Sequence, residues 1–278
     1  MSEIASRIAS SFQAVRAITS FEPEIAIILG SGLGPLAQDI NTETGASIAY
    51  GDLSGFPVST APGHAGRAVL GMLEGKRVIA FQGRVHLYEG YNAKEVVLPV
   101  SLSHKLGAKT LFVSNACGGL NPAWEAGDIM LQNDFINFTG TNPLLGPNDS
   151  SLGPRFLPLM GGYDTELASL ARIAARACNL PLREGVYLGI TGPMYAPKAE
   201  LRMYRQWGAD AIGMSTVLEV IQALYLGMRV LGLSTVTDMA IADREDHSET
   251  NEQAVIEQAQ KTGPNFRKLV KTILSRME

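Results

Sequence analysis

The chain has 278 residues, of which 46% are hydrophobic and 18% charged, which is enough apolar material for one packed core. Its formal net charge of -4 gives no sign of the clustered positive charge that nucleic-acid binding needs. No apolar run approaches the roughly 20 residues of a membrane-spanning helix, the N-terminal segment lacks a signal-peptide core, and Cys117 and Cys178 have no metal-ligand spacing. We therefore expect a single domain over residues 1–278, located in the cytoplasm, with no nucleic-acid or membrane partner.

The N-terminal part of the chain predicts a helix, a buried strand and a hairpin. Apolar residues at helical spacing favour a helix over residues 3–18, and the Ile-rich run 24–29 favours a strand that ends at Gly30. Residues 68–73 and 77–81 flank Glu74-Gly75-Lys76, which is the pattern of a hairpin with a Gly-containing turn.

The rest of the chain alternates helices with strands. Residues 93–106 predict a helix stopped by Gly107, and residues 110–114 predict a strand that runs into a loop at 115–119. The proline-rich segment 141–158 predicts a long excursion from the core. Beyond it we expect helices at 166–178, 197–207, 217–226 and 252–276, and strands at 185–190, 211–213 and 229–236. Such alternation predicts an α/β fold with helices on the faces of a sheet.

The densest polar chemistry lies in GRVHLYEGY at 83–91, where Arg84, His86, Tyr88 and Glu89 follow the apolar run 78–81. Strand alternation would place residues 84, 86 and 88 on one face. A guanidinium fork, with a histidine whose proton is held by a carboxylate, suits a small anionic ligand. The alternative is a solvated strand end.

The motif GSGLG at 30–34 follows a predicted strand, so its backbone N–H groups and the Ser31 hydroxyl could cradle a phosphate. Two alternatives stay open. Gly32, Gly34 and Ala37, with Asp52 twenty residues after Gly32, match a dinucleotide fingerprint, and the glycines could form only a structural turn. Residues 35–40 leave room for a stub of helix, which is short for a crossover between parallel strands.

Weaker signals come from three further loops. His64 lies in a glycine-flanked loop that core packing would not cover, and an exposed histidine without a role is the alternative. Ser215 precedes a predicted helix, where it could bind an anion or act as an N-cap. Residues 115–119 have only the composition of a turn.

Taken together, six ordered motifs resemble the purine nucleoside phosphorylases of the trimeric class. They are GSGLG at 30–34, GHAG at 63–66, GRVHLYEGY at 83–91, NACGGLN at 115–121, NPLLGPND at 142–149 and GMSTVLEV at 213–220. The resemblance runs from about residue 20 to the C-terminus, and it implies one α/β domain with a mixed central β-sheet flanked by helices. It also implies the reaction: a purine nucleoside and orthophosphate give a purine base and a pentose 1-phosphate, with no metal or organic cofactor.

The resemblance further implies the site residues and a homotrimer. Phosphate would be held by Ser31, His64, Arg84, His86, the N–H of Ala116 and Ser215. Tyr88 and Met214 would contact the pentose, and Tyr195 and Ile212 the purine. Phe156 lies where such enzymes lend an aromatic ring to the neighbouring subunit's site. Since phosphate is the nucleophile, no protein nucleophile is needed. We expect His86 and Asp238 to act in catalysis.

The chain departs from this family's pattern in the base pocket and at the 5′ end of the pentose. Ala196 stands where 6-oxopurine-specific relatives have glutamate, and Thr237-Asp238 stands where they have Thr-Asn. A protonated Asp238 could donate to purine N7 and accept from a 6-amino group, so we expect 6-aminopurine nucleosides to be accepted at least as well as 6-oxopurine ones. At the 5′ end, Asn251 replaces a histidine, and His247 is close enough to substitute.

The sequence leaves three other functions open. The first is a methylthioadenosine or methylthioinosine phosphorylase, which would tolerate a 5′-methylthio group. The second is an NAD-dependent oxidoreductase built on the dinucleotide fingerprint, and the third is a non-catalytic nucleoside-binding protein.

Overall fold

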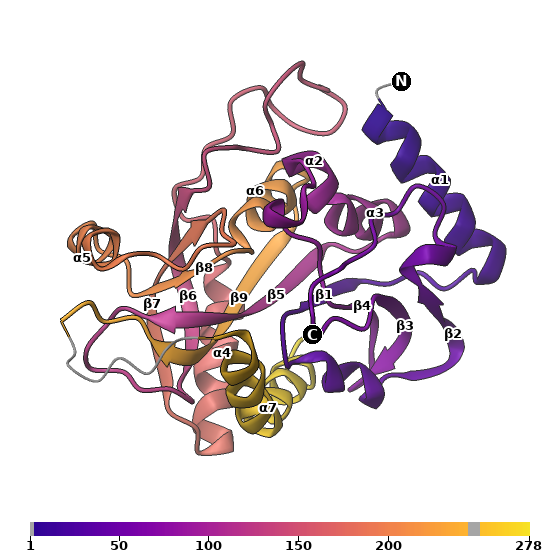
Figure 1. Ribbon diagram of the computed structural model, residues 1–278. Coiled ribbons are helices and arrows are strands. Elements are labelled where there is room, and N and C mark those ends of the chain that lie inside the picture. The colour runs from indigo at the N-terminus through magenta and orange to yellow at the C-terminus, as the bar shows by residue number, and fades with distance from the viewer. Residues whose placement is uncertain (1–2, 244–250) are drawn as a thin grey trace.

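The computed structural model describes residues 3–243 and 251–278, whose centre is a nine-stranded mixed sheet (Figure 1). The strands lie in the order β2-β3-β4-β1-β5-β8-β7-β6-β9, and β9 also pairs with β5. The segment from β5 to β9 is therefore closed into a ring, and β1 to β4 extend from it as an open sheet. The strands are β1 (Ile25–Leu29), β2 (Asn41–Ala49), β3 (Arg67–Leu73), β4 (Lys76–Gln82), β5 (Thr110–Gly119), β6 (Ile129–Phe138), β7 (Leu182–Ile190), β8 (Ala211–Gly213) and β9 (Arg229–Met239).

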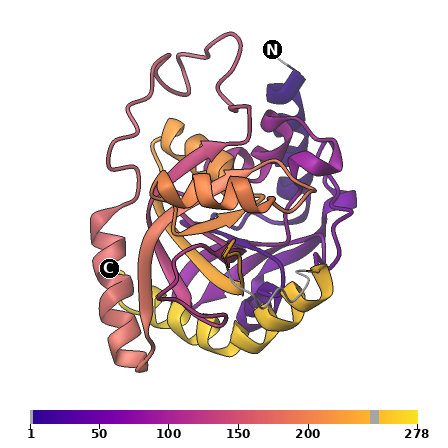
Figure 2. The same cartoon turned by 60° about the vertical axis from the view of Figure 1, so that its left-hand side comes forward.

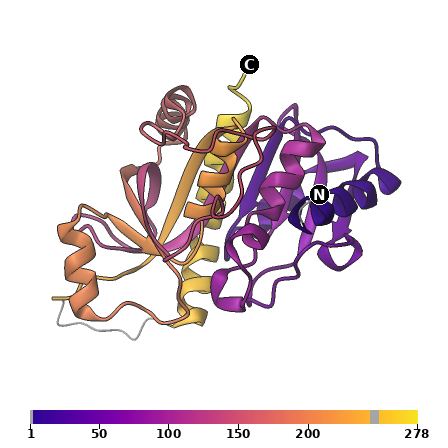
Figure 3. The ribbon, with the colours of Figure 1, turned by 90° about the horizontal axis from the view of Figure 1, so that it is seen from above.

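Helices cover both faces of the open sheet (Figure 3). The helices are α1 (Glu3–Ile18), α2 (Ala93–Val96), α3 (Leu98–Leu106), α4 (Thr165–Cys178), α5 (Lys198–Gln206), α6 (Val217–Tyr225) and α7 (Glu252–Leu274), and the short 3₁₀ turns are η1 (Gly34–Asp39), η2 (Tyr50–Asp52) and η3 (Leu87–Glu89). Alternate residues of β1 point to opposite faces. Ile25, Ile27 and Leu29 join the apolar cluster of α4 and α7, while Ala26 and Ile28 join that of α1, α3 and α6.

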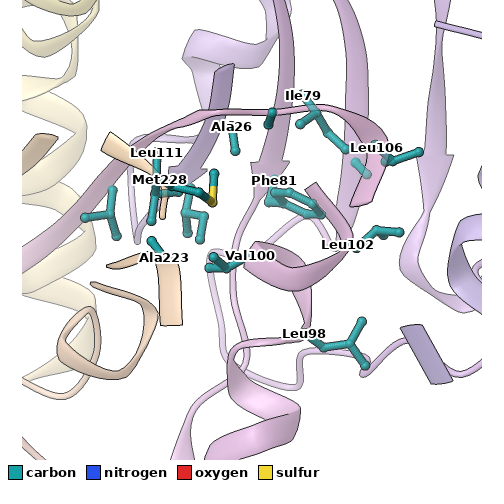
Figure 4. Packing of buried hydrophobic residues seen from close by; sticks show 14 of the residues in the cluster. Ala26, Ile79, Phe81, Leu98, Val100, Leu102, Leu106, Leu111, Ala223 and Met228 are labelled. Carbon is teal, nitrogen blue, oxygen red and sulfur yellow. The ribbon is translucent and has the colours of Figure 1, made fainter. Parts of the chain in front are cut away.

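Burial on both faces explains why β1 reads as a continuous apolar run rather than an alternating one. On the α3 face, Ile79 and Phe81 of β4 lie near Val100 and Leu102 of the helix (Figure 4). This packing fixes the carboxyl ends of β1 and β4, from which two of the predicted site loops leave.

The predicted α/β class is confirmed, and so are the N-terminal helix, the hairpin of β3 and β4, and the helices and strands predicted after the excursion, apart from small differences at their ends. The single helix predicted over 93–106 is wrong, because it divides at Val97 into α2 and α3. Pro99 lacks the N–H that a continuous helix would donate to the carbonyl of Glu95.

The loop predicted at residues 115–119 is also wrong. Strand β5 continues to Gly119, pairing in parallel with β9 and then antiparallel with β8. Two glycines and a cysteine look like a turn in isolation. Within the ring, both neighbouring strands satisfy the backbone of this segment, which overrides its local preference.

Two strands had no prediction. Strand β2 is an edge strand whose first four residues are exposed, so it has no apolar pattern to detect. Its Gly45 allows a close approach, since a Cβ there would lie 1.9 Å from the carbonyl oxygen of Leu70. Strand β6 begins as the buried run Ile129 to Gln132 and ends partly exposed. Its apolar residues therefore follow neither the two-residue alternation of a half-buried strand nor the period of a helix.

The predicted excursion is confirmed, because residues 139–164 contain neither helix nor strand and loop away from the sheet before α4 (Figure 2). The hydroxyl of Tyr225 on α6 anchors the segment by donating to Asn148 Oδ1 at 2.9 Å, and it also lies 2.9 Å from the carbonyl of Asp149. Gly153 packs against the same tyrosine, where a Cβ would lie 2.5 Å from the Tyr225 carbonyl oxygen. The tip of the loop is thus held in a defined place.

Candidate functional site

A cavity of about 450 Å³ brings together segments that lie far apart in the chain. It is bounded by the loops after β1 and β4, the ends of β5, β8 and β9, and the start of α7. Of the predicted site residues, thirteen line it: Ser31, His64, Arg84, His86, Tyr88, Ala116, Tyr195, Ala196, Ile212, Met214, Ser215, Thr237 and Asp238. The cavity therefore collects all the predicted phosphate ligands and all the predicted base contacts.

Arg84 is the most deeply buried of these residues, at 2% exposure. Its Nε donates to Glu219 Oε1 at 3.0 Å, its Nη2 lies 2.9 Å from Glu219 Oε2, and its Nη1 donates to the Ser114 carbonyl at 2.6 Å. Glu219, on α6, is fully buried. One edge of the guanidinium is thus turned to the carboxylate, and Nη2 is itself buried. Arg84 also lines the cavity, where its fixed positive charge can attract an oxyanion.

Residues 84, 86 and 88 lie close together as predicted, but the prediction that strand alternation groups them is wrong. Strand β4 ends at Gln82, so no strand alternation acts there. The rings instead stack in a row: His64 on His86 with centroids 5.3 Å apart, and His86 on Tyr88 at 4.6 Å. The 3₁₀ turn η3 produces the second contact.

Glu89 fixes the orientation of His86. Its Oε1 lies 2.8 Å from both the backbone N and the Nδ1 of His86, and its Oε2 accepts from the N–H and hydroxyl of Thr60. Burial alone would raise the pKa of the Glu89 carboxyl, but the bonds from His86 and Thr60 lower it to about 2. The carboxylate therefore holds the proton of Nδ1 and leaves Nε2 of His86 for the cavity.

His64 is held in a similar way by the neighbouring loop. Its Nδ1 lies 2.8 Å from the carbonyl of Arg84, which can only accept, and its Nε2 lies 3.3 Å from the hydroxyl of Ser31. Burial, and next the nearby His86, lower the pKa of His64 to about 4. His64 is thus a neutral imidazole near pH 7 that links the loops after β1 and β4.

The glycine loop after β1 is built for a close approach to β5. A Cβ at Gly30 would lie 2.8 Å from the Cα of Asn115, and Gly32 has a φ of +75° with Ala259 of α7 next to it. The loop leads into the 3₁₀ turn η1 and then the antiparallel edge strand β2, not into a helical crossover. Asp52 is exposed and does not line the cavity. The dinucleotide interpretation therefore lacks the geometry that it requires.

At the other end of the cavity, Asp238, the second-to-last residue of β9, lies among apolar residues. Its Oδ1 accepts from Thr237 Oγ1 at 3.1 Å, and Tyr195, Ala196 and Ile212 are also part of the lining. Burial, and next the charges of Asp238 and Glu252, raise the pKa of Tyr195. This end combines an apolar slot with few polar groups, as small-molecule sites do.

Two predicted residues are not brought into the cavity. Asn251 caps α7, accepting from the N–H of Ala254 at 2.9 Å, and Phe156 is 87% exposed on the excursion loop. Neither lines the cavity. His247 lies outside the described residues.

Four residues that the sequence did not single out belong to the site. Asn115 on β5, Lys198 on α5 and Glu252 on α7 line the cavity, and Glu219 holds Arg84. Glu252 was detectable as an acidic residue in the first turn of a predicted helix. The other three carried no local signal, since their roles depend on contacts with distant segments.

The part of the chain that the structure describes has no group of three or more His, Cys, Asp or Glu side chains placed to hold a metal ion. Within residues 3–243 and 251–278, no helix is both long and apolar enough to cross a membrane.

Both the sequence and the fold of the chain are similar to those of known proteins. A family model described as "Phosphorylase superfamily" matches residues 24–275. The chain is 48% identical to purine nucleoside phosphorylase 1 of Bacillus subtilis (strain 168) over 92% of this chain and 93% of that protein. It is 41% identical to purine nucleoside phosphorylase of Mus musculus over 92% of this chain and 90% of that protein. The structure is similar to that of Schistosoma mansoni purine nucleoside phosphorylase in complex with adenosine, with a TM-score of 0.92 and 34% identity over 98% of each chain.

Proposed function

The chain belongs to the phosphorylase superfamily, and on that premise we propose that it is a purine nucleoside phosphorylase. It exchanges a purine nucleoside and orthophosphate for a purine base and a pentose 1-phosphate. The observation that carries this proposal is one cavity with the guanidinium of Arg84 and two serine hydroxyls at one end and an apolar slot with a single carboxyl group, that of Asp238, at the other.

The residues act on a reaction in which a phosphate oxygen attacks C1′ as the N-glycosidic bond breaks. The bond's electron pair goes to the purine, which takes up a proton at N7, and positive charge builds on the pentose. Arg84, Ser31 and Ser215 hold the phosphate beside that carbon, where its negative charge stabilises the cationic pentose. For this the Ser31 hydroxyl turns its proton from Nε2 of His64, 3.3 Å away, to the phosphate. Glu89 orients His86 so that its Nε2 faces the cavity. The His86 ring stacks on that of Tyr88, which borders the pentose. No metal or organic cofactor is part of this proposal, because phosphate itself is the nucleophile.

The base end supports acceptance of 6-aminopurines at least equal to that of 6-oxopurines. Asp238, when protonated, donates to N7 and offers its carbonyl oxygen to a 6-amino group, and the side chain of Ala196 supplies no acceptor for the N1–H of a 6-oxopurine. Lys198 is a cavity-lining cation that a 6-oxo group can also use. For this reason we propose acceptance of both classes rather than exclusion of one.

Glu252, not Asn251, is the residue that we assign to the 5′ end of the pentose. It opens α7, lines the cavity, and acts electrostatically on both Tyr88 and Tyr195, the predicted pentose and base contacts. A carboxylate accepts a hydrogen bond from a 5′-hydroxyl but receives none from a 5′-methylthio group. This favours ordinary nucleosides over the methylthionucleosides of the alternative function.

A matched pair of variants tests this assignment. Glu252→Leu should raise the ratio of kcat/KM for methylthioadenosine to that for adenosine. Glu257→Leu, an exposed change on the same helix outside the cavity lining, should leave the ratio unchanged. An unchanged ratio in Glu252→Leu removes that residue from the 5′ site.

We also propose a homotrimer in which Phe156 completes a neighbour's site, and a cytoplasmic location. The anchored excursion loop exposes Phe156 at 87%, and Leu145, Leu152 and Met160 beside it in the chain are also exposed, so this surface offers apolar area for a second copy. Cys117 and Cys178 are unpaired and buried, which suits a reducing compartment. Light scattering should give three times the 29.7 kDa mass of the chain, and Phe156→Ala should raise KM for nucleoside. A monomer with full activity contradicts the trimer proposal.

The reaction class is tested by assaying adenosine, inosine, guanosine and methylthioadenosine with and without orthophosphate. We expect base release only with phosphate, with adenosine at least as good as inosine. A strong preference for guanosine defeats the base assignment, and base release without phosphate defeats the proposed reaction.

A further inference from the structure

The turn that delivers Ser215 to the cavity is strained. Thr216, between β8 and α6, has φ 70° and ψ -52°, a conformation that residues with a branched Cβ rarely adopt. The N–H of Val217 donates to the carbonyl of Ser215 at 2.8 Å, so these residues form a three-residue γ-turn. Thr216 is only 2% exposed, so this conformation is enforced by its surroundings.

A buried amide on β5 holds this turn. Nδ2 of Asn115 donates to Oγ1 of Thr216 at 2.9 Å, across 101 positions of sequence. Asn115 is 1% exposed and also lines the cavity, and its Oδ1 is buried without a hydrogen-bond partner among the described residues. The amide therefore keeps one unsatisfied acceptor, which costs free energy, while it clamps the hydroxyl of Thr216.

The clamp also sets the direction of the next hydrogen bond. Nδ2 can only donate, so Oγ1 of Thr216 accepts from it and directs its own proton elsewhere. Oγ of Ser215 lies 3.1 Å from Oγ1 of Thr216 and is the hydroxyl placed to receive that proton. Ser215 is then left with its own O–H to donate, either to the neighbouring hydroxyl of Tyr187 or into the cavity when an anion is bound there. The opposite direction would turn lone pairs of Ser215 toward an anion.

We propose that Asn115 and Thr216 are positioning residues, which hold the Ser215 loop in its strained turn and direct the Ser215 hydroxyl proton to bound phosphate. This inference rests on the proposed function, because it requires phosphate beside Ser215. It adds to that function a buried chain of donors, Asn115 to Thr216 to Ser215, in which each bond polarises the next.

Variants at Thr216 separate positioning from general stability. Thr216→Val keeps the shape but removes the hydroxyl, and it should raise KM for phosphate about tenfold, the effect of losing an oriented bond to a charged group. KM for nucleoside should change much less. Thr216→Ser keeps the hydroxyl and should restore KM for phosphate to within about threefold of the wild-type value.

Two further variants keep the test decisive if Thr216→Val folds poorly. Thr216→Gly relieves the strain at positive φ but leaves Nδ2 of Asn115 without its acceptor, so its Tm should change little while KM for phosphate still rises. Asn115→Leu removes the donor and should also raise KM for phosphate selectively. A merely structural role predicts lower Tm with unchanged KM values.

The outcomes distinguish this inference from the proposed function. If the wild-type protein shows no phosphate-dependent base release, the proposed function fails. If the wild type is active and KM for phosphate is the same in Thr216→Val, Thr216→Gly and Asn115→Leu, the positioning inference alone is overturned. Equal impairment of Thr216→Ser and Thr216→Val also overturns it.

Discussion

The buried ion pair of Arg84 and Glu219 allows stability and phosphate binding to be separated by experiment. Both side chains are at most 2% exposed, and two nitrogens of the guanidinium face the two carboxylate oxygens at 2.9 to 3.0 Å. Arg84→Met leaves the Glu219 carboxylate buried without its counter-charge, so we expect a loss of about 3 to 5 kcal/mol in the free energy of unfolding. The double variant Arg84→Met/Glu219→Leu removes both charges and should regain most of that loss. It should stay about 1 kcal/mol below wild type, because the Ser114 carbonyl still lacks its donor.

Phosphate use should not recover with stability. Both variants lack the guanidinium, so kcat/KM for phosphate should fall about 100-fold or more in each. Urea unfolding gives the free energies, and phosphorolysis at varied phosphate gives the kinetics. A double variant that is stable and still uses phosphate within about threefold of wild type would refute the assignment of Arg84 as a phosphate ligand. A single variant as stable as wild type would refute the ion pair.

Three further predictions follow from the site. Asp238→Asn should raise the ratio of kcat/KM for inosine to that for adenosine by about tenfold, and an unchanged ratio removes this residue from base selection. Gly30→Ala places a Cβ 2.8 Å from the backbone of Asn115, so it should lower Tm and raise KM for phosphate, whereas Gly34→Ala, with nothing within 4 Å, should do neither. His64 has a folded pKa of about 4, below its unfolded value, so the unfolded chain binds the extra proton as pH falls from about 6.5 to 4 and the stability falls, by at most about 3 kcal/mol. The variant His64→Gln should lack this part of the pH dependence in urea unfolding, and identical pH curves for the two proteins would contradict it.

The sequence predicted those parts of the fold in which local pattern and final environment agree. Strand β1 is buried on both faces and reads as an apolar run, and α4 and α7 have amphipathic patterns with clear ends. The sequence did not predict strand β2, because an exposed edge strand needs no apolar residues. It did not predict the end of β5 either, because the partner strands β8 and β9 come about 90 or more positions later in the chain. The ring is thus a product of long-range pairing.

For the site, the sequence predicted residues whose chemistry is visible in isolation, such as Arg84 beside His86. It missed residues whose role depends on a partner that is distant in the sequence. Glu219 is an ordinary helix glutamate until the fold places it against a guanidinium 135 positions away. Asn115 likewise reads as a turn residue until β5 is extended and the strained turn of Thr216 meets it.

We propose that phosphate binds in one end of this cavity, held by side chains from separate loops. A crystal structure of the protein soaked in orthophosphate tests it most directly. We expect tetrahedral density within hydrogen-bond distance of Arg84, Ser31 and Ser215, at the end of the cavity opposite Asp238. Density at other sites only, with these three side chains bound to no ion, would contradict it.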